Sequence, residues 1–246
     1  MTIRGWNTRY RQIRHEFGYK ESEDFAAAKK LDKIIEKAFP LSKFKKIISG
    51  KTVVVIGAGP SLDGAIPEIK KLKNVIKIVA DGAIQPLIKN NIKFDILVTD
   101  LDGDLASIKK IGNTNIPIVI HAHGDNEDKL EIVNKFRNKI GTTQTRKFGK
   151  LQNFGGFTDG DRCVFLAERF SPKKIILFGM DFGNEIGKYS KHIVKNRQVK
   201  LKKLAYGKKL LEWFSTKSNS ELYTTSKTII GYKKINFADL DYIVNS

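Results

Sequence analysis

The sequence predicts an α/β fold in which helices cover both faces of a mostly parallel β-sheet, and three observations indicate it. Short apolar runs rich in β-branched residues recur from Thr52 onward. Helix-like stretches separate these runs. Glycine or polar residues follow each run, where a strand would end. Because the runs are continuously apolar rather than alternating, they are typical of strands buried on both faces.

The strands of this sheet are expected at five places, with a sixth near the C-terminus. The five are Thr52–Ile56, Val75–Val79, Ile96–Thr99, Ile116–His121 and Ile175–Phe178, and the sixth is Glu221–Thr225. Between them, Asn126–Arg137 is expected to form a helix with Leu130, Val133 and Phe136 on one side. Strand–helix alternation of this kind predicts a Rossmann-like sheet, whose ligands bind beyond the carboxyl ends of the strands.

Helical segments precede the sheet, and a basic region follows it. Apolar residues repeat at helical spacing from Trp6 to Phe17. A second helix is expected after Ser22, which would cap it, and Pro40 ends it. The last part of the chain is basic and is expected to be helical through Phe214. The chain is therefore divided into a helical N-terminal region (1–50), an α/β catalytic core (51–181) and a basic helical and strand region that packs on the core (182–246).

The composition is that of a globular protein, with 41% hydrophobic and 29% charged residues among 246. The longest apolar runs fall far short of the roughly 18 residues that a membrane span needs. No apolar stretch follows the basic N-terminus, so a secretory signal is not expected. The single cysteine, Cys163, excludes an internal disulfide and a multi-thiolate metal site within one chain. We therefore expect a cytoplasmic protein without a membrane partner.

The charge is strongly basic, with 45 Lys and Arg residues against 26 Asp and Glu residues and a formal net charge of +19. An excess of this size favours polyanions, which include nucleic acid, an acidic surface and a phosphorylated substrate. A solvated lysine surface explains it equally well. The charge alone does not choose between these interpretations.

A glycine-rich loop, Gly-Ala-Gly-Pro-Ser, follows the first expected strand at residues 57–61. Gly57 and Gly59 fit a dinucleotide fingerprint, but its third glycine is replaced by Leu62. Asp81 lies 24 residues after Gly57, near the place of a ribose-binding acid. We expect the loop amides to approach a phosphate at the helix N-terminus, with Ser61 as a hydroxyl donor or cap. The alternative is a tight turn into a helix.

An acidic cluster follows the third expected strand. In an extended segment Asp100, Asp102 and Asp104 would face the same way, roughly 6–7 Å apart. Carboxylates so placed repel one another unless a cation joins them, and oxygen ligands are those that Mg²⁺ prefers. An EF-hand fits badly, because Leu105 and Ile111 stand where its loop needs glycine and glutamate. The sequence predicts a magnesium site here, with a solvated acidic turn as the alternative.

Two histidines, His121 and His123, follow the fourth expected strand. No thiolates accompany them, so we expect them to orient neighbouring groups rather than to bind zinc. Asp125 begins the next helix beside them, as a helix cap or as a site residue.

Two later segments also carry polar and basic groups. Thr158 or Asp159 can cap the helix after a glycine pair, and Arg162 can pair with the nearby acids or reach a phosphate. The segment Lys188–Lys209 has nine lysines and arginines and no acid. It is either a solvated helix face or a lid that closes over a nucleotide triphosphate.

Six motifs occur in the order G-A-G-P-S-L, A-D-G-A, T-D-L-D-G-D, H-A-H-G-D-N, G-G-F-T-D-G-D-R and L-F-G-M-D-F-G. From about Lys51 to Lys209 the chain closely resembles the archaeal-type 6-hydroxymethyl-7,8-dihydropterin pyrophosphokinases, the MptE-like family. It resembles the catalytic domain of thiamin pyrophosphokinases more distantly. The resemblance implies Mg²⁺-dependent transfer of diphosphate from ATP to the pterin hydroxymethyl group, with release of AMP, in tetrahydromethanopterin or folate biosynthesis.

The resemblance and the motifs together give a set of expected site residues. The catalytic candidates are Asp81, Asp125 and Asp161, and either Asp81 or Asp125 would take the hydroxymethyl proton. The candidates for metal binding are Asp100, Asp102 and Asp104. The candidates for binding the nucleotide are Gly57, Gly59, Ser61, Thr158, Asp159, Arg162, Lys200 and Lys203.

Three other functions stay open at this point. Related domains occur in motility-associated glycosyltransferases, which use a nucleotide sugar. The net charge would also fit a nucleic-acid-binding protein, although nucleic acid is not the partner we expect. The dinucleotide oxidoreductase ranks last, because such an enzyme has no use for the acidic cluster. The expected partners are ATP and a hydroxymethyl dihydropterin, and a homo-oligomer is left open.

Overall fold

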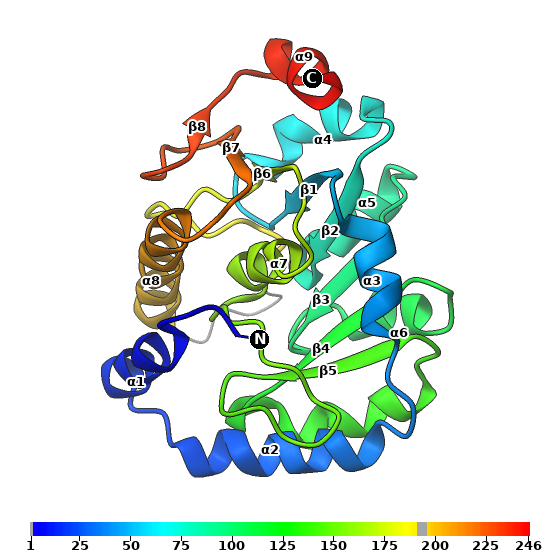
Figure 1. Ribbon diagram of the computed structural model, residues 1–246, viewed down its shortest axis with the longest axis vertical. Helices are drawn as coiled ribbons and strands as arrows, with labels where there is room; N and C mark the ends of the chain where they lie inside the picture. The colour runs from blue at the N-terminus through cyan, green and yellow to red at the C-terminus, as the bar shows by residue number, and fades with distance from the viewer. Residues whose placement is uncertain (1, 191–195) are drawn as a thin grey trace.

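A computed structural model of the chain describes residues 2–190 and 196–246. In this part of the chain an eight-stranded sheet has the order β5-β4-β3-β2-β1-β6-β7-β8, and every neighbouring pair is parallel (Figure 1). The strands are β1 Thr52–Ile56, β2 Ile76–Ala80, β3 Ile96–Thr99, β4 Ile118–Ala122, β5 Lys139–Thr143, β6 Lys174–Phe178, β7 Glu221–Thr224 and β8 Lys233–Lys234. The predicted parallel sheet is confirmed.

Helices connect the strands and extend the chain at both ends. The α-helices are α1 Trp6–Phe17, α2 Glu21–Ile34, α3 Leu41–Ile48, α4 Leu62–Lys71, α5 Ile84–Lys89, α6 Leu105–Gly112, α7 Asp159–Glu168, α8 Arg197–Ser215 and α9 Leu240–Asn245. The 3₁₀ segments are η1 Asp81–Ala83, η2 Gly124–Lys135 and η3 Phe237–Asp239.

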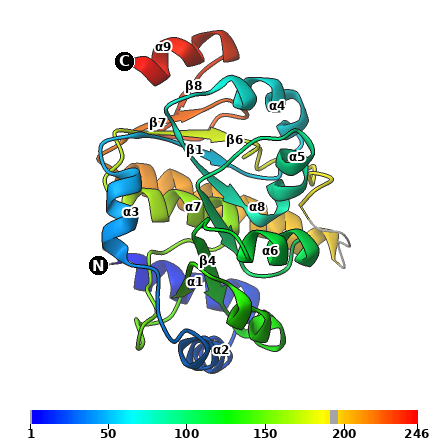
Figure 2. The same ribbon diagram turned by 90° about the vertical axis from the view of Figure 1, so that its right-hand side faces the viewer.

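Helices lie on both sides of the sheet (Figure 2), and a hydrophobic core lies on each face. Alternate residues of β1 divide between them, with Val54 and Ile56 in one core and Val53 and Val55 in the other. Helices α2, α4, α5 and α6 supply the first core, and α1, α3, α7 and α8 supply the second. Helices on both faces explain why the strands read as continuous apolar runs.

The predicted elements agree with this arrangement except in detail. β1 and β3 have the predicted bounds, and β2, β4, β6 and β7 are shifted at one or both ends by a residue or two. The strand β5 was not predicted, because its sequence, Lys-Ile-Gly-Thr-Thr, lacks an apolar run although four of its five residues are buried. Ser22 lies within the first turn of α2 rather than at its cap, which is Lys20.

The expected helix at Asn126–Arg137 is the 3₁₀ segment η2. Its apolar side was predicted correctly, since Leu130 and Val133 are buried. Asp, Asn and Gly are frequent in this segment, and their side chains compete for backbone hydrogen bonds. The expected basic helix begins only at Arg197, and Lys191 and Lys195 lie outside the described residues.

The topology reverses at the centre of the sheet. From β1 the chain adds β2 to β5 on one side, then returns to place β6 on the other side of β1. Open parallel sheets bind ligands at such a switch point, beyond the carboxyl ends of the strands. The loops after β1 and β6 therefore mark the expected position of a site. No helix in the described part of the chain is long and apolar enough to span a membrane.

Candidate active site at the carboxyl edge of the sheet

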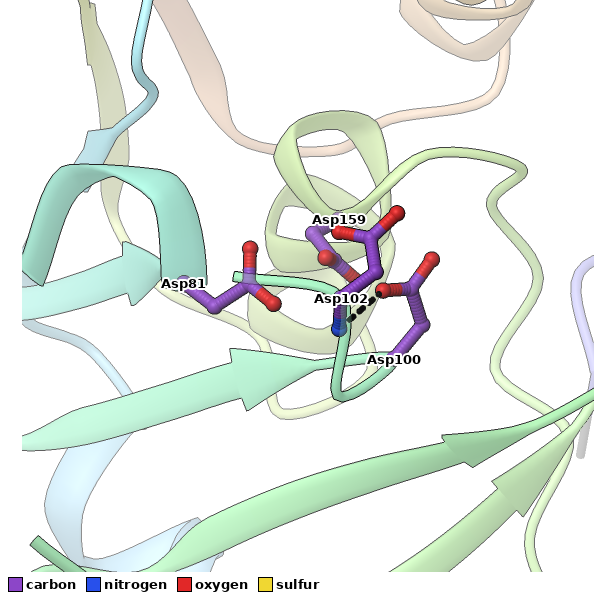
Figure 3. Close-up of side chains that lie close together, drawn as sticks. All are labelled: Asp81, Asp100, Asp102 and Asp159. Carbon is purple, nitrogen blue, oxygen red and sulfur yellow. Dashed lines mark hydrogen bonds between the residues drawn. The ribbon is translucent and has the colours of Figure 1, made fainter. Parts of the chain in front are cut away.

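Four aspartates converge beside the switch point. One carboxylate oxygen from each of Asp81, Asp100, Asp102 and Asp159 lies within 4.8 Å of the others. Figure 3 shows that they come from three segments: the end of β2, the loop after β3 and the first turn of α7. In the β3 loop the backbone N–H of Asp102 donates a 3.2 Å hydrogen bond to Asp100 Oδ1. The cluster is thus assembled from parts of the chain nearly 80 residues apart.

Local hydrogen bonds hold the loop after β3 against Asp81. The Thr99 hydroxyl donates to Asp81 Oδ2 at 2.9 Å and accepts from the Leu101 N–H at 2.8 Å. The Gly103 N–H donates to the same Asp81 oxygen at 3.2 Å. Leu101 has a φ of 66°, which is unusual for a leucine, and its buried side chain anchors the turn. A Cβ on Gly103 would lie 2.9 Å from the Asp81 carboxyl carbon, so glycine permits this approach.

Burial and mutual repulsion raise the pKa values of two of these carboxyls. Burial raises the pKa of Asp81 to about 7, and the charges of Asp100 and Asp102 add to the effect. Burial also raises the pKa of Asp159 well above its usual value, with Asp100 and Asp81 contributing. Asp159 Oδ1 is buried and makes no hydrogen bond to any described residue. Clustered carboxylate oxygens, one of them without a hydrogen bond to the described residues, fit a hard divalent cation such as Mg²⁺.

Asp104, a candidate metal ligand, lies outside this cluster. Its Oδ2 accepts a 3.0 Å hydrogen bond from the Ser107 N–H and caps α6. The extended spacing that aligned it with Asp100 and Asp102 is broken, because the chain turns at Leu101 and a helix begins at Leu105. We therefore replace Asp104 by Asp159 in the candidate metal set.

Asp161, a catalytic candidate, instead organises the start of α7. It is fully buried and accepts hydrogen bonds from the N–H groups of Phe157 and Thr158 and from the Thr158 hydroxyl. Burial raises its pKa, while these donors act in the opposite direction. It does not line the cleft, whereas Thr158 and Asp159 do. The capping box that it forms with Thr158 explains its position.

Arg162 lies behind the cluster. Its Nη1 and Nη2 donate to the carbonyls of Gly156 and Phe157 at 2.8 and 3.0 Å. Its Nε is 4.0 Å from Asp159 Oδ1. The guanidinium therefore shapes the glycine turn before α7 and places a buried positive charge near Asp159.

The glycine-rich loop after β1 packs tightly against the loop after β6. The N–H groups of Gly57 and Gly59 donate to the carbonyls of Phe178 and Gly179 at 2.9 and 2.8 Å. A Cβ on Gly59 would lie 2.6 Å from the Gly179 carbonyl oxygen and 2.1 Å from Asp181 Oδ2. These two glycines are therefore needed for the close approach of the two loops. Their N–H groups already donate to protein carbonyls.

Asp181, which sequence reasoning did not single out, occupies the N-terminus of α4. Its Oδ2 accepts hydrogen bonds from both the N–H and the hydroxyl of Ser61, each at 3.0 Å. Ser61 was expected to meet a phosphate or to cap the helix, and here it binds this carboxylate. The only signal in the sequence was the position of Asp181 directly after the fifth expected strand, in L-F-G-M-D-F-G.

A cleft runs from these loops to the aspartate cluster. It is bounded by the glycine loop, the four aspartates, the start of α7 and one face of α8. Lys200 and Lys203 of α8 also line it. The Lys203 ammonium lies 5.4 Å from the ring centre of Tyr19 and 5.9 Å from that of Phe157. Lys188 instead forms an exposed ion pair with Asp63 at 2.8 Å.

The turn after β4 supports the cluster from the other side. Asn126 Nδ2 donates to the carbonyls of Asp100 and His121 at 2.6 and 2.7 Å, which ties the ends of β3 and β4 together. His123 Nε2 lies 3.5 Å from Asp100 Oδ2. The Asp125 side chain is 62% exposed, and its Oδ2 is 3.9 Å from His123 Nδ1. Asp125 thus lies at the rim of the site, and Asn126 is a supporting residue that the sequence pattern suggested only as a helix start.

Comparison with known proteins decides the family. The family model described as 6-hydroxymethylpterin diphosphokinase MptE-like matches residues 26–187. The chain belongs to the MptE-like family. Relatives named 6-hydroxymethyl-7,8-dihydropterin pyrophosphokinase in Methanocaldococcus jannaschii and Pyrococcus furiosus are 42% and 39% identical to it. The matches cover 90% and 88% of this chain and 99% and 96% of those relatives. The relative of the same name in Methanothermobacter thermautotrophicus is 36% identical, over 87% of this chain and 95% of its own length.

A solved structure of a glycosyltransferase has a similar fold. The MAf glycosyltransferase from Magnetospirillum magneticum AMB-1 superposes with a TM-score of 0.59 at 13% identity. The match covers 78% of this chain and 34% of the glycosyltransferase, so the chain spans about a third of that protein. At this identity the likeness shows the α/β fold alone.

Proposed function

We propose that this protein is a 6-hydroxymethyl-7,8-dihydropterin pyrophosphokinase that transfers diphosphate from ATP to the pterin hydroxymethyl group and releases AMP. The observation that carries the proposal is the cluster of four aspartates at the switch point of an MptE-like sheet. Diphosphoryl transfer needs charge neutralisation and positioning more than covalent help from the protein. The cluster and the lysines that line the cleft provide groups for both tasks.

Asp100 and Asp102 would hold Mg²⁺, with Asp159 as a further carboxylate of the cluster. All three contribute oxygens to the cluster, and Asp159 Oδ1 has no described hydrogen-bond partner. Bound Mg²⁺ would neutralise the phosphate oxygens and polarise the β-phosphorus. Lys200 and Lys203 also line the cleft, where they would bind the remaining phosphate oxygens.

Asp81 is our choice for the group that takes the proton of the hydroxymethyl oxygen. It lies within the cluster, where hydrogen bonds from Thr99 and Gly103 hold its carboxylate beside Asp100 and Asp102. The other candidate, Asp125, is exposed at the rim. The pterin oxygen would attack the β-phosphorus in line with the departing AMP. The reaction would serve tetrahydromethanopterin or folate biosynthesis in the cytoplasm.

Substitution of the metal-binding carboxylates tests this proposal. Asp100→Asn and Asp102→Asn are expected to lower kcat for AMP formation roughly 100-fold or more, because each removes a carboxylate that would hold the Mg²⁺ that neutralises the phosphate oxygens. AMP is measured by chromatography with ATP, Mg²⁺ and the dihydropterin. Asp128→Asn, at an exposed position of η2, is the matched control and should retain wild-type turnover. Wild-type turnover by the two cluster variants would reject the proposal.

A further inference from the structure

A smaller recess adjoins the cleft on the far side of Asp100. Asp100, Phe157 and Lys203 line both spaces, so the recess opens beside the aspartate cluster. Its inner wall is made by Asp24 of α2, His121 of β4 and Gln144, which follows β5. None of these three residues is used in the proposed transfer. We call this space the side recess.

The hydrogen bonds of His121 indicate which ring nitrogen carries the proton. The Thr142 hydroxyl donates to the Ile120 carbonyl at 3.0 Å, because a carbonyl can only accept. The same hydroxyl lies 3.2 Å from His121 Nδ1 and therefore accepts a hydrogen bond from it. This arrangement favours the tautomer of His121 with the proton on Nδ1, which leaves Nε2 as an acceptor. His121 is 1% exposed, and Nε2 has no hydrogen-bond partner among the described residues.

A second network fixes the orientation of Gln144. The Asp24 carboxylate accepts hydrogen bonds from the Gly124 N–H at 2.9 Å, the Tyr10 hydroxyl at 2.6 Å and Gln144 Nε2 at 2.8 Å. Because the amide nitrogen of Gln144 is turned toward Asp24, its other amide atom, Oε1, is an acceptor. Asp24 and Gln144 are both buried, so this arrangement is held rigidly.

Beside the Arg162 guanidinium, the side recess therefore carries two oriented acceptors, which suit a ligand with adjacent N–H donors. Leaving a buried acceptor unpaired is unfavourable, and a bound ligand that donates to it removes that cost. Tyr19 and Phe157 give the recess an aromatic wall, with ring centres 6.4 Å apart. A flat heterocycle with two neighbouring N–H groups on one edge matches both features.

We propose that the side recess binds the 2-amino-4-oxopyrimidine ring of the pterin substrate, with His121 Nε2 and Gln144 Oε1 accepting hydrogen bonds from its 2-amino and N3–H groups. This inference rests on the proposed function. Asp100 separates the recess from the main cleft, so a pterin bound there meets the nucleotide at the aspartate cluster. Thr142 and Asp24 are positioning residues, because they act through His121 and Gln144.

Pterin binding without nucleotide tests the assignment directly. The probe is 6-hydroxymethylpterin, followed by its own fluorescence, and the comparison ligand is 6-hydroxymethyllumazine, in which an oxo group replaces the 2-amino group. The wild-type protein should bind the pterin at least tenfold more tightly. His121→Phe and Gln144→Met should weaken pterin binding about tenfold and abolish the preference over lumazine, because each removes one acceptor. Binding of a non-hydrolysable ATP analogue should not change.

Two further variants test whether weaker pterin binding comes from the lost acceptor rather than from a disturbed fold. His15→Phe makes the same change at an exposed histidine of α1 and should bind both ligands like the wild type. Thr142→Val keeps the imidazole but removes the acceptor that holds the proton on Nδ1, so it should also lose the preference for the pterin. Thermal unfolding checks that each variant is folded.

The outcomes separate this inference from the proposed function. Unchanged pterin affinity and preference in folded His121→Phe, Gln144→Met and Thr142→Val proteins would overturn the side recess, while AMP formation by the wild type would still uphold the pyrophosphokinase. Loss of preference in those variants supports the recess even if no AMP is formed, a result that would instead reject the transfer reaction. No binding of pterin by the wild type would overturn the side recess as a preformed pterin site, and AMP formation would then decide on the transfer reaction by itself.

Discussion

At the scale of single residues, the surroundings of Asp81 determine whether its carboxyl group is ionised. It is buried, accepts hydrogen bonds from Thr99 and Gly103, and faces Asp100 and Asp102. The hydrogen bonds with Thr99 and Asp159 lower the pKa of Asp81, but burial and the charges of Asp100 and Asp102 outweigh them and raise it. A cation bound to the cluster would reverse that balance, which links the ionisation of Asp81 to metal binding.

Asp81→Asn is expected to stabilise the protein in the presence of a chelator at pH 8. The folded-state pKa of about 7 exceeds the ordinary value of 3.8, so the protonated form is favoured in the folded state. The stabilisation that comes from this pKa shift is therefore fully present below about pH 4 and is lost as the pH rises through about 7. The neutral asparagine avoids this loss, by on the order of 1–3 kcal/mol at pH 8. Urea unfolding at pH 4.5 and pH 8 measures it, and an equal effect at both pH values would contradict the account.

At the scale of elements, the contact between the loops after β1 and β6 holds the switch point together. Asp181 accepts both hydrogen bonds that Ser61 offers at the N-terminus of α4. Gly57 and Gly59 allow the two loops to meet without side chains between them. The dinucleotide-like pattern in the sequence therefore marks a site of close packing next to the cleft.

Asp181→Ala should lower the free energy of unfolding by about 1 kcal/mol, within the range of roughly 0.5–2 kcal/mol typical of a lost helix cap. Asp181→Asn keeps an oxygen acceptor for the Ser61 N–H and should recover most of that loss. Chemical denaturation of the three proteins measures the difference. If the asparagine variant is as unstable as the alanine variant, the hydrogen bonds to Ser61 are not the cause.

The elements that were predicted correctly are those that the pattern of their own residues marks. β1 and β3 are continuous apolar runs, and their bounds were correct. β5 is buried by α2 and its neighbour β4 rather than marked by its own residues, so only the tertiary structure identifies it. In the candidate site, Asp100 and Asp102 were predicted from their spacing. Asp159 joins them from α7, and no local pattern distinguishes that metal candidate from the helix cap Asp104.

At the scale of the whole molecule, the chain has a formal net charge of +19, whereas its cleft contains a cluster of four aspartates. Lys200 and Lys203 line the same cleft, and further basic residues follow along α8. A positive surface attracts a nucleoside triphosphate over distances longer than a hydrogen bond, and salt screens that attraction. The proposed function would account for the charge by a phosphorylated small substrate.

The KM for ATP should therefore rise several-fold between about 50 mM and 500 mM KCl, because the Debye length falls by roughly a factor of three over that range. The kcat should change much less, since the aspartate cluster is partly shielded from solvent. Steady-state turnover at fixed Mg²⁺ gives both constants. Tight, salt-dependent binding to generic duplex DNA together with a salt-independent KM would favour the nucleic-acid-binding alternative instead.

The most direct test of the central claim is the identity and number of the products. The wild-type protein, incubated with ATP, Mg²⁺ and 6-hydroxymethyl-7,8-dihydropterin, should form AMP and pterin diphosphate in equal amounts, and a chelator should stop both. Chromatography of the same reaction resolves AMP, ADP and the pterin products. Formation of ADP, or of AMP without pterin diphosphate, would contradict diphosphate transfer at the aspartate cluster.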